Sequence, residues 1–499
     1  MRRLRARGDG GDTRGEGTPP CGDGEARRGE ILNRSVARRG GSVALVLLLA
    51  GLAGGCSATG LAGEREYPAP VPLRYVGVIG ASEGPHYALS PQEARGSSYL
   101  PRSNVLLLPG GGVMYVPEGG DSPVTASGMD AGARASVRES RAWLAAGIVP
   151  GESEFEREIA ARSLLNLRLL TDPSGAALAA PNPRWDYVWP RDASWMSAAF
   201  SVTEHREEAR SILDFLARVR DERGWEARYT PDGRPVPDGR PAQLDANGWF
   251  LWAVWVYAET GEGYKEVRDL WPEVRRAAEE AVGALGSDGL PPGGADYWER
   301  RTLLPNLGNS AALLVGLRSA QDLAAGLGHE READRYRRSA DRLEDAVHRR
   351  LGPRAFADGY TRTTSPASGR DAAVTFLAPP FGREREGLRG EVISTEEALT
   401  APNGGVLPGE RWPQEPTVSW TPESAFFMLF AAASGDRERA GRWLRWLAEH
   451  RTLLGAFPEK VDGDGEPQAA APLAWTDAAV LLALAAGEGM LPGPPGEMG

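Results

Sequence analysis

The chain has 499 residues, of which 41% are hydrophobic, and this is enough for one large domain with a smaller attachment. Its formal net charge is -11 at pH 7. Such an acidic balance argues against nucleic acid or an anionic membrane surface as the main partner. The basic residues are almost all arginine, because Lys265 and Lys460 are the only lysines.

A short apolar run at positions 43–53 follows Arg38 and Arg39 and precedes two glycines and Cys56. The run is too short for a permanent membrane helix, so it predicts a signal peptide. The small residues before Cys56 resemble a bacterial lipobox, with Ala53 where leucine is commoner. We therefore expect an extracytoplasmic protein that a lipid on Cys56 anchors to the cell membrane. Ordinary secretion with a chance cysteine is the alternative.

The sequence pattern of the rest of the chain changes near position 146. We take 1–56 as a leader with the signal peptide, and 57–145 as a tether with a small irregular or β-containing region, because Gly, Pro and Ser interrupt its short β-like runs. The segment 146–490 reads as one helical domain.

Amphipathic segments follow one another in this domain, often as closely linked pairs. We predict helices over 154–170, 192–202, 204–222, 244–260, 264–285, 309–326, 330–351, 394–400, 423–433, 437–450 and 476–486. Gly328 and Gly435 lie between the partners of two pairs, where they stop one helix before the next begins. No short repeat of fixed period is visible, which disfavours a tetratricopeptide-like array. The pattern predicts an all-α fold, a closed barrel of helical hairpins.

Several of the fifteen tryptophans flank charged or polar residues in predicted loops, including Trp189, Trp298 and Trp412. An aromatic plate beside hydrogen-bonding side chains suits a sugar, because one pyranose face is apolar and the rim carries hydroxyl groups. Other tryptophans lie on helix faces, where we expect them in the core: Trp252, Trp255, Trp443 and Trp446.

Five motifs occur in order between about Glu154 and Leu484. They are the entry segment Ser163-Leu-Leu-Asn-Leu-Arg-Leu-Leu-Thr-Asp-Pro, Tyr187-Val-Trp-Pro-Arg-Asp, Gln243-Leu-Asp-Ala-Asn-Gly-Trp, Asp296-Tyr-Trp-Glu, and a closing match of Phe457-Pro-Glu-Lys-Val followed by Pro472-Leu-Ala-Trp-Thr-Asp. In this order and spacing the chain resembles glycoside hydrolase family 15, the glucoamylase-like family. The resemblance implies an (α/α)6 barrel of six helical hairpins, in agreement with the helical pattern.

The resemblance also implies roles for particular residues. It places the general acid at Glu299 and the general base at Glu459. Cleavage of a glycosidic bond needs one carboxylic acid to protonate the leaving oxygen and a second carboxylate to activate water or to attack. The substrate-binding residues that we expect are Trp189, Arg191, Asp192, Gln243, Asp245, Trp298, Arg411, Trp412 and Trp475. For Asp192 and Asp245, a simple helix-start role is the alternative.

One segment departs from the family. Between Gly404 and Trp420 the chain lacks the tyrosine- and glycine-containing loop that is common there, and we expect Arg411, Trp412 and Trp420 to take its place. The five histidines form no metal-ligand spacing, and the Gly-rich run at 110–112 lacks the residues of a phosphate loop. We therefore expect no metal and no cofactor.

These observations favour a monomeric, exo-acting glycoside hydrolase that cleaves an α-glucosidic bond in a disaccharide or oligosaccharide with inversion. Within the family, a hydrolase directed to trehalose or to isomaltose and dextran is the alternative. From other classes, the alternatives are a non-catalytic sugar-binding lipoprotein and a structural envelope protein. The presence of both Glu299 and Glu459 argues against a binding-only protein.

Overall fold

The computed structural model describes residues 71–81, 84–357 and 359–496. The chain divides into two compact units, Met1–Glu64 and Arg65–Gly499, and all described residues belong to the second. Cys56 and the predicted signal peptide lie outside the described residues. In the part of the chain that is described, no helix is both long and apolar enough to cross a membrane.

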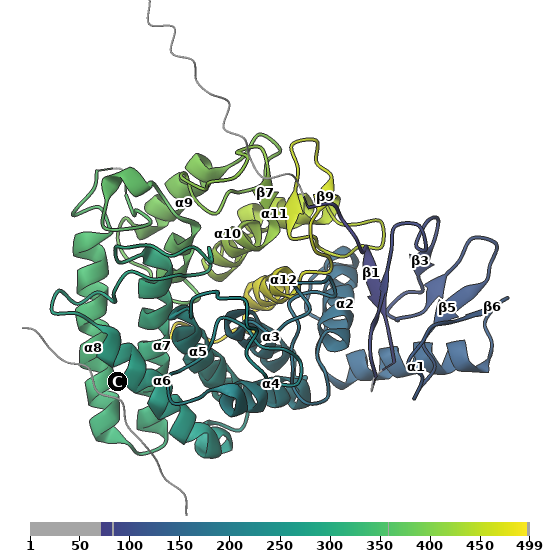
Figure 1. Cartoon of the computed structure of the whole chain (residues 1–499), viewed down its shortest axis with the longest axis horizontal. Helices are drawn as coiled ribbons and strands as arrows, with labels where there is room; N and C mark the ends of the chain where they lie inside the picture. The colour runs from purple at the N-terminus through teal and green to yellow at the C-terminus, as the bar shows by residue number, and fades with distance from the viewer. Residues whose placement is uncertain (1–70, 82–83, 358, 497–499) are drawn as a thin grey trace, which may run out of the picture. The chain divides into compact units, whose positions relative to one another are not determined.

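Six inner helical elements form a closed ring in which each contacts the next (Figure 1). They are α3 (Pro190–Val202), α5 (Asp245–Glu259), α7 (Leu307–Gly326), the short 3-10 helix η3 (Ala372–Leu377), α10 (Thr421–Ala433) and α12 (Ala474–Gly487), which returns to α3. Nearly all residues of these inner elements are buried, and in α3 every one is. Most positions of these elements are accordingly apolar, and some of the buried polar residues among them, such as Arg191, Asp192 and Glu423, lie in first turns.

Six outer helices alternate with the inner elements along the chain and cover them from outside. They are α2 (Glu154–Leu169), α4 (Arg206–Val219), α6 (Trp271–Ala284), α8 (Glu330–Arg350), α9 (Leu388–Leu399) and α11 (Arg437–Glu449). Most of them bury one stripe, for example Ile212, Phe215 and Leu216 on α4, whereas α2 also buries much of its remaining surface. This confirms the predicted all-α (α/α)6 barrel of six hairpins.

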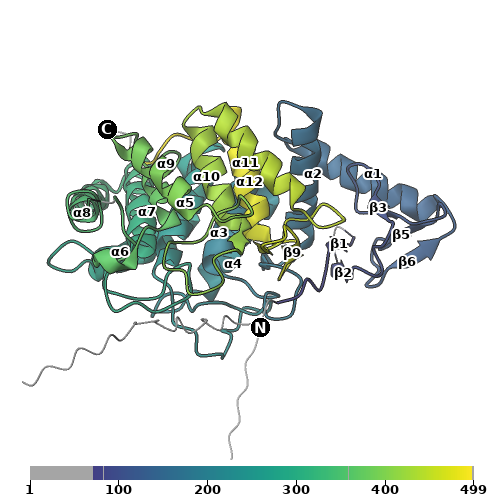
Figure 2. The ribbon, with the colours of Figure 1, turned by 90° about the horizontal axis from the view of Figure 1, so that it is seen from above.

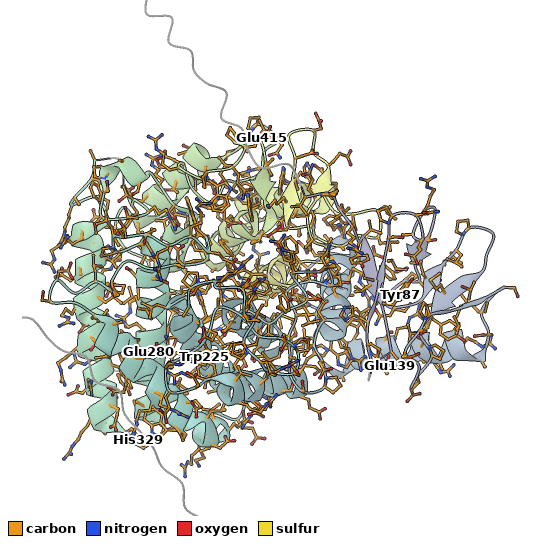
Figure 3. All side chains as sticks on the ribbon, viewed as in Figure 1. Tyr87, Glu139, Trp225, Glu280, His329 and Glu415 are labelled. Atoms are coloured by element: carbon orange, nitrogen blue, oxygen red, sulfur yellow. The ribbon has the colours of Figure 1, made fainter. Side chains whose placement is uncertain are left out.

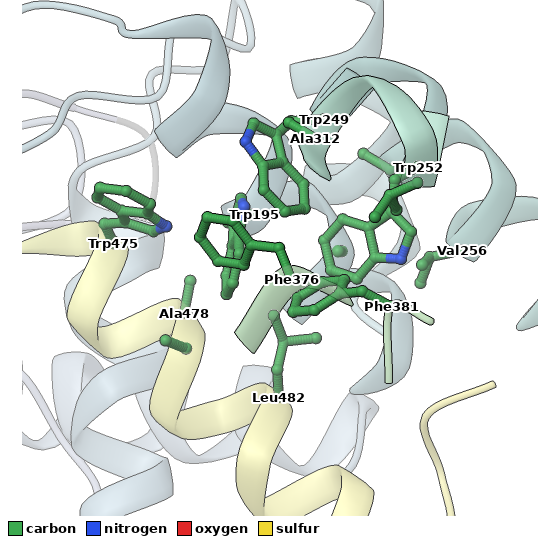
Figure 4. Packing of buried hydrophobic residues seen from close by; sticks show 14 of the residues in the cluster. Trp195, Trp249, Trp252, Val256, Ala312, Phe376, Phe381, Trp475, Ala478 and Leu482 are labelled. Atoms are coloured by element: carbon green, nitrogen blue, oxygen red, sulfur yellow. The ribbon is translucent and has the colours of Figure 1, made fainter. Parts of the chain in front are cut away.

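Glycines allow two inner helices to approach closely. A Cβ atom at Gly316 of α7 would lie 2.5 Å from Cα of Gly248 of α5, so any larger residue would push the two helices apart. Aromatic rings fill the centre of the ring beside this contact. Figure 4 shows Trp195, Trp249 and Phe376 packed together, and their ring centroids lie within 4.9–6.1 Å of one another.

Two predicted elements need correction. The segment 264–285 is not one helix: a 3-10 helix, η1 (Tyr264–Leu270), precedes α6, because Pro272 lies at the start of α6 and cannot continue a preceding helix. A further helix, α1 (Ala131–Ala146), occupies the region that we predicted to be irregular or β-containing. Its cap, Asp130, accepts a hydrogen bond from the backbone of Ala133.

Short strands precede α1. The strands β1 (Gly77–Ile79) and β2 (Tyr87–Leu89) form one antiparallel pair, and a four-stranded antiparallel sheet contains β3 (Ser98–Tyr99), β4 (Leu106–Leu107), β5 (Val113–Tyr115) and β6 (Val124–Ala126). This region is bonded to the barrel, since Thr452 donates to the carbonyl of Val76 and Arg162 of α2 donates to that of Ser103.

A third sheet lies among the loops at one end of the ring. It contains β7 (Ser419–Trp420), β8 (Lys460–Val461) and β9 (Pro467–Gln468). Figure 2 shows β9 at the same end of the helices as the long connection between α4 and α5. Side chains fill the space between the helices, while Glu415, in the loop before β7, lies at the outer surface (Figure 3).

Candidate active site

One cavity of about 310 Å³ lies where α3, α10 and α12 begin. Both predicted catalytic glutamates, Glu299 and Glu459, line it, although they are far apart in the sequence. The cavity also brings together six of the predicted substrate-binding residues, namely Trp189, Arg191, Asp192, Trp298, Trp412 and Trp475. Its volume falls at the small end of the range of about 300–1,000 Å³ that is usual for ligand sites.

Glu299 stands at the end of a rigid loop, Asp296 to Glu299. Arg362 pairs with Asp296 at 2.8 Å and with Asp371 at 2.9 Å, and all three side chains are almost fully buried. The guanidinium of Arg362 also lies 3.6 Å from the ring centre of Trp298. A loop held by a buried, paired charge network cannot shift without exposing unpaired charges, so Glu299 is held in place.

The backbone of Glu299 is itself unusual. Its φ is +56°, in the left-handed region that residues other than glycine seldom adopt, and such strain is concentrated at functional sites. Its Oε1 accepts a hydrogen bond from the indole N–H of Trp189, and its Oε2 pairs with Arg240. The carboxyl group therefore points at the cavity wall formed by α3 and the α4–α5 connection.

Glu459 is placed by the small third sheet. Its N–H donates to the carbonyl of Ala470 at 2.8 Å, and its own carbonyl accepts from Thr421 at the start of α10. Its Oε1 accepts from the indole N–H of Trp185 at 3.4 Å, and Nζ of Lys460 lies 3.8 Å from its Oε2. Each of the two glutamates thus has one indole donor and one cation beside it.

Arg191 forms the floor of the cavity. One nitrogen donates to Oε1 of Gln243 at 2.6 Å and lies 3.4 Å from Asp245, while another lies 3.0 Å from Asp192. Burial raises the pKa of Asp192 and that of Asp245, the latter to about 6, and the charge of Arg191 opposes both shifts. The guanidinium also covers the ring of Trp475 at 4.4 Å.

Aromatic side chains form the opposite wall. The rings of Trp298, Trp412 and Trp420 follow one another edge to face, with centroids 4.7 and 5.0 Å apart. Nζ of Lys460 lies 4.2 Å from the ring centre of Trp420. Such a row of indoles provides apolar surfaces against which sugar rings can lie.

Many polar atoms around this cavity have no hydrogen-bond partner in the protein. They include Nε of Arg191, Oε2 of Glu423, Oε2 of Glu459 and the indole N–H groups of Trp298, Trp412, Trp420 and Trp475. Buried polar groups are nearly always satisfied, so a cluster of unsatisfied ones requires an explanation. A ligand that carries many hydroxyl groups supplies one.

Three predicted residues do not line the cavity. Gln243 and Asp245 lie behind its floor, where they hold Arg191. Asp245 is not a helix cap, because the cap position of α5 is Leu244 and has no side-chain bond. Arg411 is exposed beside its neighbour Trp412 and does not reach the cavity.

Sequence reasoning missed other residues of the lining, above all Trp185, Arg184, Arg240, Glu423 and Lys460. Glu423 follows Pro422 in the first turn of α10, as Asp192 follows Pro190 in that of α3, and this common pattern could have revealed it. Lys460 directly follows Glu459 and is one of two lysines in the chain. Arg240 carries no such signal, because it lies in a long connection without a motif.

Comparison with known sequences points to one family. The family model described as glycosyl hydrolases family 15 matches residues 154–418, more than half of the chain. An uncharacterized glycosyl hydrolase of Methanocaldococcus jannaschii is 23% identical over 352 residues, which are 65% of this chain and 55% of that protein. The chain therefore spans about half the length of this curated relative.

Solved structures are similar in fold. A bacterial glucoamylase in complex with acarbose has a TM-score of 0.59 at 17% identity, over 74% of this chain and 63% of its own. A wild-type glycosidase has a TM-score of 0.58 at 21% identity, over 68% of this chain and all of its own. The glucoamylase from Saccharomycopsis fibuligera has a TM-score of 0.52 at 14% identity, over 68% and 97% of the two chains.

Proposed function

The chain belongs to the glycosyl hydrolases family 15, and on this basis we propose that it hydrolyses α-glucosidic bonds, with Glu299 as general acid and Glu459 as general base. The observation that carries the proposal is the cavity itself. Two carboxylates, a row of indoles and many unsatisfied polar atoms meet in one small space. This is the chemistry that a sugar ring and its cleavage require.

The indole contacts of the two glutamates suit these roles. In the proposed reaction Glu299 gives its proton to the glycosidic oxygen while Glu459 takes a proton from a water molecule that attacks the anomeric carbon. One C–O bond breaks and one forms, so the products are glucose and the free leaving group. The donor from Trp189 orients Glu299, and the donor from Trp185 orients Glu459.

We further propose that the reaction inverts the anomeric carbon and that the enzyme acts on chain ends. Inversion needs room for water between the base and the sugar, with the two carboxyl groups about 6.5–9.5 Å apart. A cavity of only about 310 Å³ favours a terminal residue of a disaccharide or oligosaccharide over the middle of a long chain. Acarbose in the similar bacterial glucoamylase and glucose in a similar glycosidase variant are consistent with a glucoside substrate.

We also propose an extracytoplasmic monomer that a lipid on Cys56 anchors to the membrane. Only the sequence pattern at 38–56 supports the anchor. Labelling of expressing cells with a radioactive or clickable fatty acid tests it. The wild-type chain should be labelled and Cys56→Ser should not, and equal labelling of both would refute the anchor.

A substrate panel tests the activity. The purified full chain is incubated with maltose, isomaltose, trehalose, maltooligosaccharides and α-glucosyl fluoride, and free glucose is measured. We expect glucose from at least one of these, and β-glucose first by NMR. The exposed Glu397→Gln on α9 serves as a control for the loss of a carboxylate, and should retain the wild-type rate.

The outcomes separate the parts of the proposal. If neither the fluoride nor any glucoside yields glucose, α-glucosidase activity is refuted. Early α-glucose would refute inversion but leave hydrolysis. If Glu299→Gln or Glu459→Ala cleaved the best glucoside at the wild-type rate, the assigned roles would be wrong.

A further inference from the structure

Three arginines form a linked cluster at the cavity, and one of them, Arg240, pairs with Glu299. Arg184 and Arg240 line the cavity, and Arg228 lies behind its wall, between the rings of Tyr187 and Trp189 at 4.8 and 4.9 Å. The three are linked directly, because Arg228 donates to the backbone carbonyl of Arg184 and both Arg228 and Arg240 pair with Asp238.

Carboxylates do not balance this cluster. Arg228 and Arg240 share the single carboxylate of Asp238, and Arg240 has Glu299 as its other partner. Among the described residues the guanidinium of Arg184 has no carboxylate partner, since the nearby Asp186 accepts a bond from the Arg184 backbone N–H instead. Burial lowers the pKa of Arg240, and the like charges of Arg228 and then Arg184 lower it further, while Asp238 opposes the shift.

The proposed mechanism makes the imbalance larger. An ion pair with arginine favours the ionised form of a carboxyl group, whereas a general acid must carry its proton before it can act. When Glu299 takes that proton, Arg240 loses one of its two carboxylate partners. Among the described residues, Asp238 is then the one remaining ion-pair partner of the three arginines, while the charge of Glu459 acts on Arg240 without a direct pairing.

Backbone strain at two residues of the cavity lining also indicates a ligand-binding site here. Arg184 has a φ of +78°, so a residue other than glycine is held in the left-handed region with its side chain at the cavity. Glu299, which also lines the cavity, is strained in the same sense. Strain of this kind persists where the surrounding structure imposes it, most often at ligand-binding sites.

We propose that the substrate carries an anionic group, a carboxylate or a phosphate ester, and that Arg184 and Arg240 bind it. The inference rests on the proposed function and adds to it the class of substrate. A general acid protonates the oxygen of the leaving group, so cations beside Glu299 face the leaving group and not the glucosyl ring. The anionic group therefore belongs to the leaving group. When it binds Arg240, it replaces Glu299 as the partner and frees that glutamate to hold a proton.

Matched pairs of substrates test the proposal. Maltobionate and maltitol have the same linkage and differ in a carboxylate on the leaving group, and trehalose 6-phosphate and trehalose differ in a phosphate. We expect kcat/KM to be about tenfold to a hundredfold higher for the anionic member of at least one pair, as for one charge-assisted contact. The pair that shows the preference identifies the anion. The preference should shrink as salt is raised.

A second measurement, which does not depend on the glycosidic linkage that the enzyme cleaves, accompanies the comparison of substrates. Hydrolysis of α-glucosyl fluoride is followed in the presence of gluconate, sorbitol, glucose 6-phosphate or glucose. The anionic compounds should inhibit at lower concentrations than their neutral partners. Arg184→Gln should reduce this difference by about tenfold or more, and the exposed Arg234→Gln in the α4–α5 connection should not.

The results distinguish two failures. If the fluoride is hydrolysed but neither the substrates nor the inhibitors show an anionic preference, the inference is overturned and the proposed function stands. A preference that Arg184→Gln leaves intact also overturns it. If the fluoride is not hydrolysed at all, the proposed function fails. Calorimetric binding of the same four compounds then decides the inference alone, with equal affinities of anionic and neutral compounds counting against it.

Discussion

Glu423 should make the folded protein less stable as the pH rises, and Glu423→Gln should remove that loss. The side chain is 3% exposed in the first turn of α10, and its Oε2 has no hydrogen-bond partner. Burial raises the pKa of Glu423 to about 8 from 4.5, and the charges of Glu459 and Asp371 act in the same direction. The folded state therefore binds this proton more tightly than the unfolded chain does.

The sign and size of the change in stability follow from the difference between the pKa of Glu423 in the folded state and that in the unfolded state. Below about pH 4.5 the group is protonated in both states and its contribution to stability is fully present. Between about pH 4.5 and about pH 8 only the folded state holds the proton, so the free energy of unfolding falls by about 1.4 kcal/mol per pH unit from this group. The loss across this window amounts to a few kcal/mol. A glutamine at position 423 has the same shape and does not titrate.

Urea unfolding at about pH 5 and about pH 8 measures the effect. The free energy of unfolding of Glu423→Gln should gain a few kcal/mol over that of the wild type between the two pH values. The exposed Glu397→Gln should follow the wild type at both. If Glu423→Gln and the wild type lost stability in parallel, the carboxyl group of Glu423 would be ionised in the folded state and the reasoning would be refuted.

Three further predictions concern the cavity. Arg191→Lys should reduce kcat/KM nearly as much as Arg191→Ala, since an ammonium cannot reach Gln243, Asp245 and Asp192 at once; a variant with full activity would contradict this. Arg362→Met should cost about 3–5 kcal/mol in urea unfolding, because its two buried aspartate partners lose their counter-charge; an unchanged midpoint would contradict it. Glu299→Gln should slow maltose by about 10²–10⁴-fold and α-glucosyl fluoride much less, whereas Glu459→Ala should slow both alike; equal losses in Glu299→Gln would refute the acid.

Most of the helices follow from the sequence because each carries its own signal. Most outer helices show a stripe of apolar residues, and the inner ones are largely apolar, so most of their ends are predicted within a few residues, although α9 begins at Leu388 and not at the predicted 394. The element η3 was not predicted, since six residues are too few for a helical period. The helix α1 was missed because its segment, rich in Ala, Ser and Arg, has only a weak apolar stripe.

The candidate site was predicted only in part, and the reason is physical. Glu299, Glu459 and the aromatic residues beside them lie in compact motifs that resemble a family. Trp185 and Arg240 reach the two glutamates through contacts between loops that are far apart in the chain, and no local pattern records such contacts. The same limit explains Arg411. We predicted it to bind substrate because it neighbours Trp412, but its side chain is exposed and does not line the cavity.

The direction of the inner helices explains why the cavity can hold so many carboxyl groups. The helices α3, α5 and α10 each carry an acidic residue in the first turn, Asp192, Asp245 and Glu423, and these three turns lie in or just behind the cavity. A helix N-terminus carries partial positive charge from its free N–H groups, which opposes the rise that burial causes in the pKa values of these three acids but does not cancel it. The barrel thus concentrates several positive helix ends at one place. Because burial keeps Glu423 protonated up to about pH 8, that acid adds no negative charge beside Glu459, and the positive helix ends favour a ligand that brings a negative charge of its own.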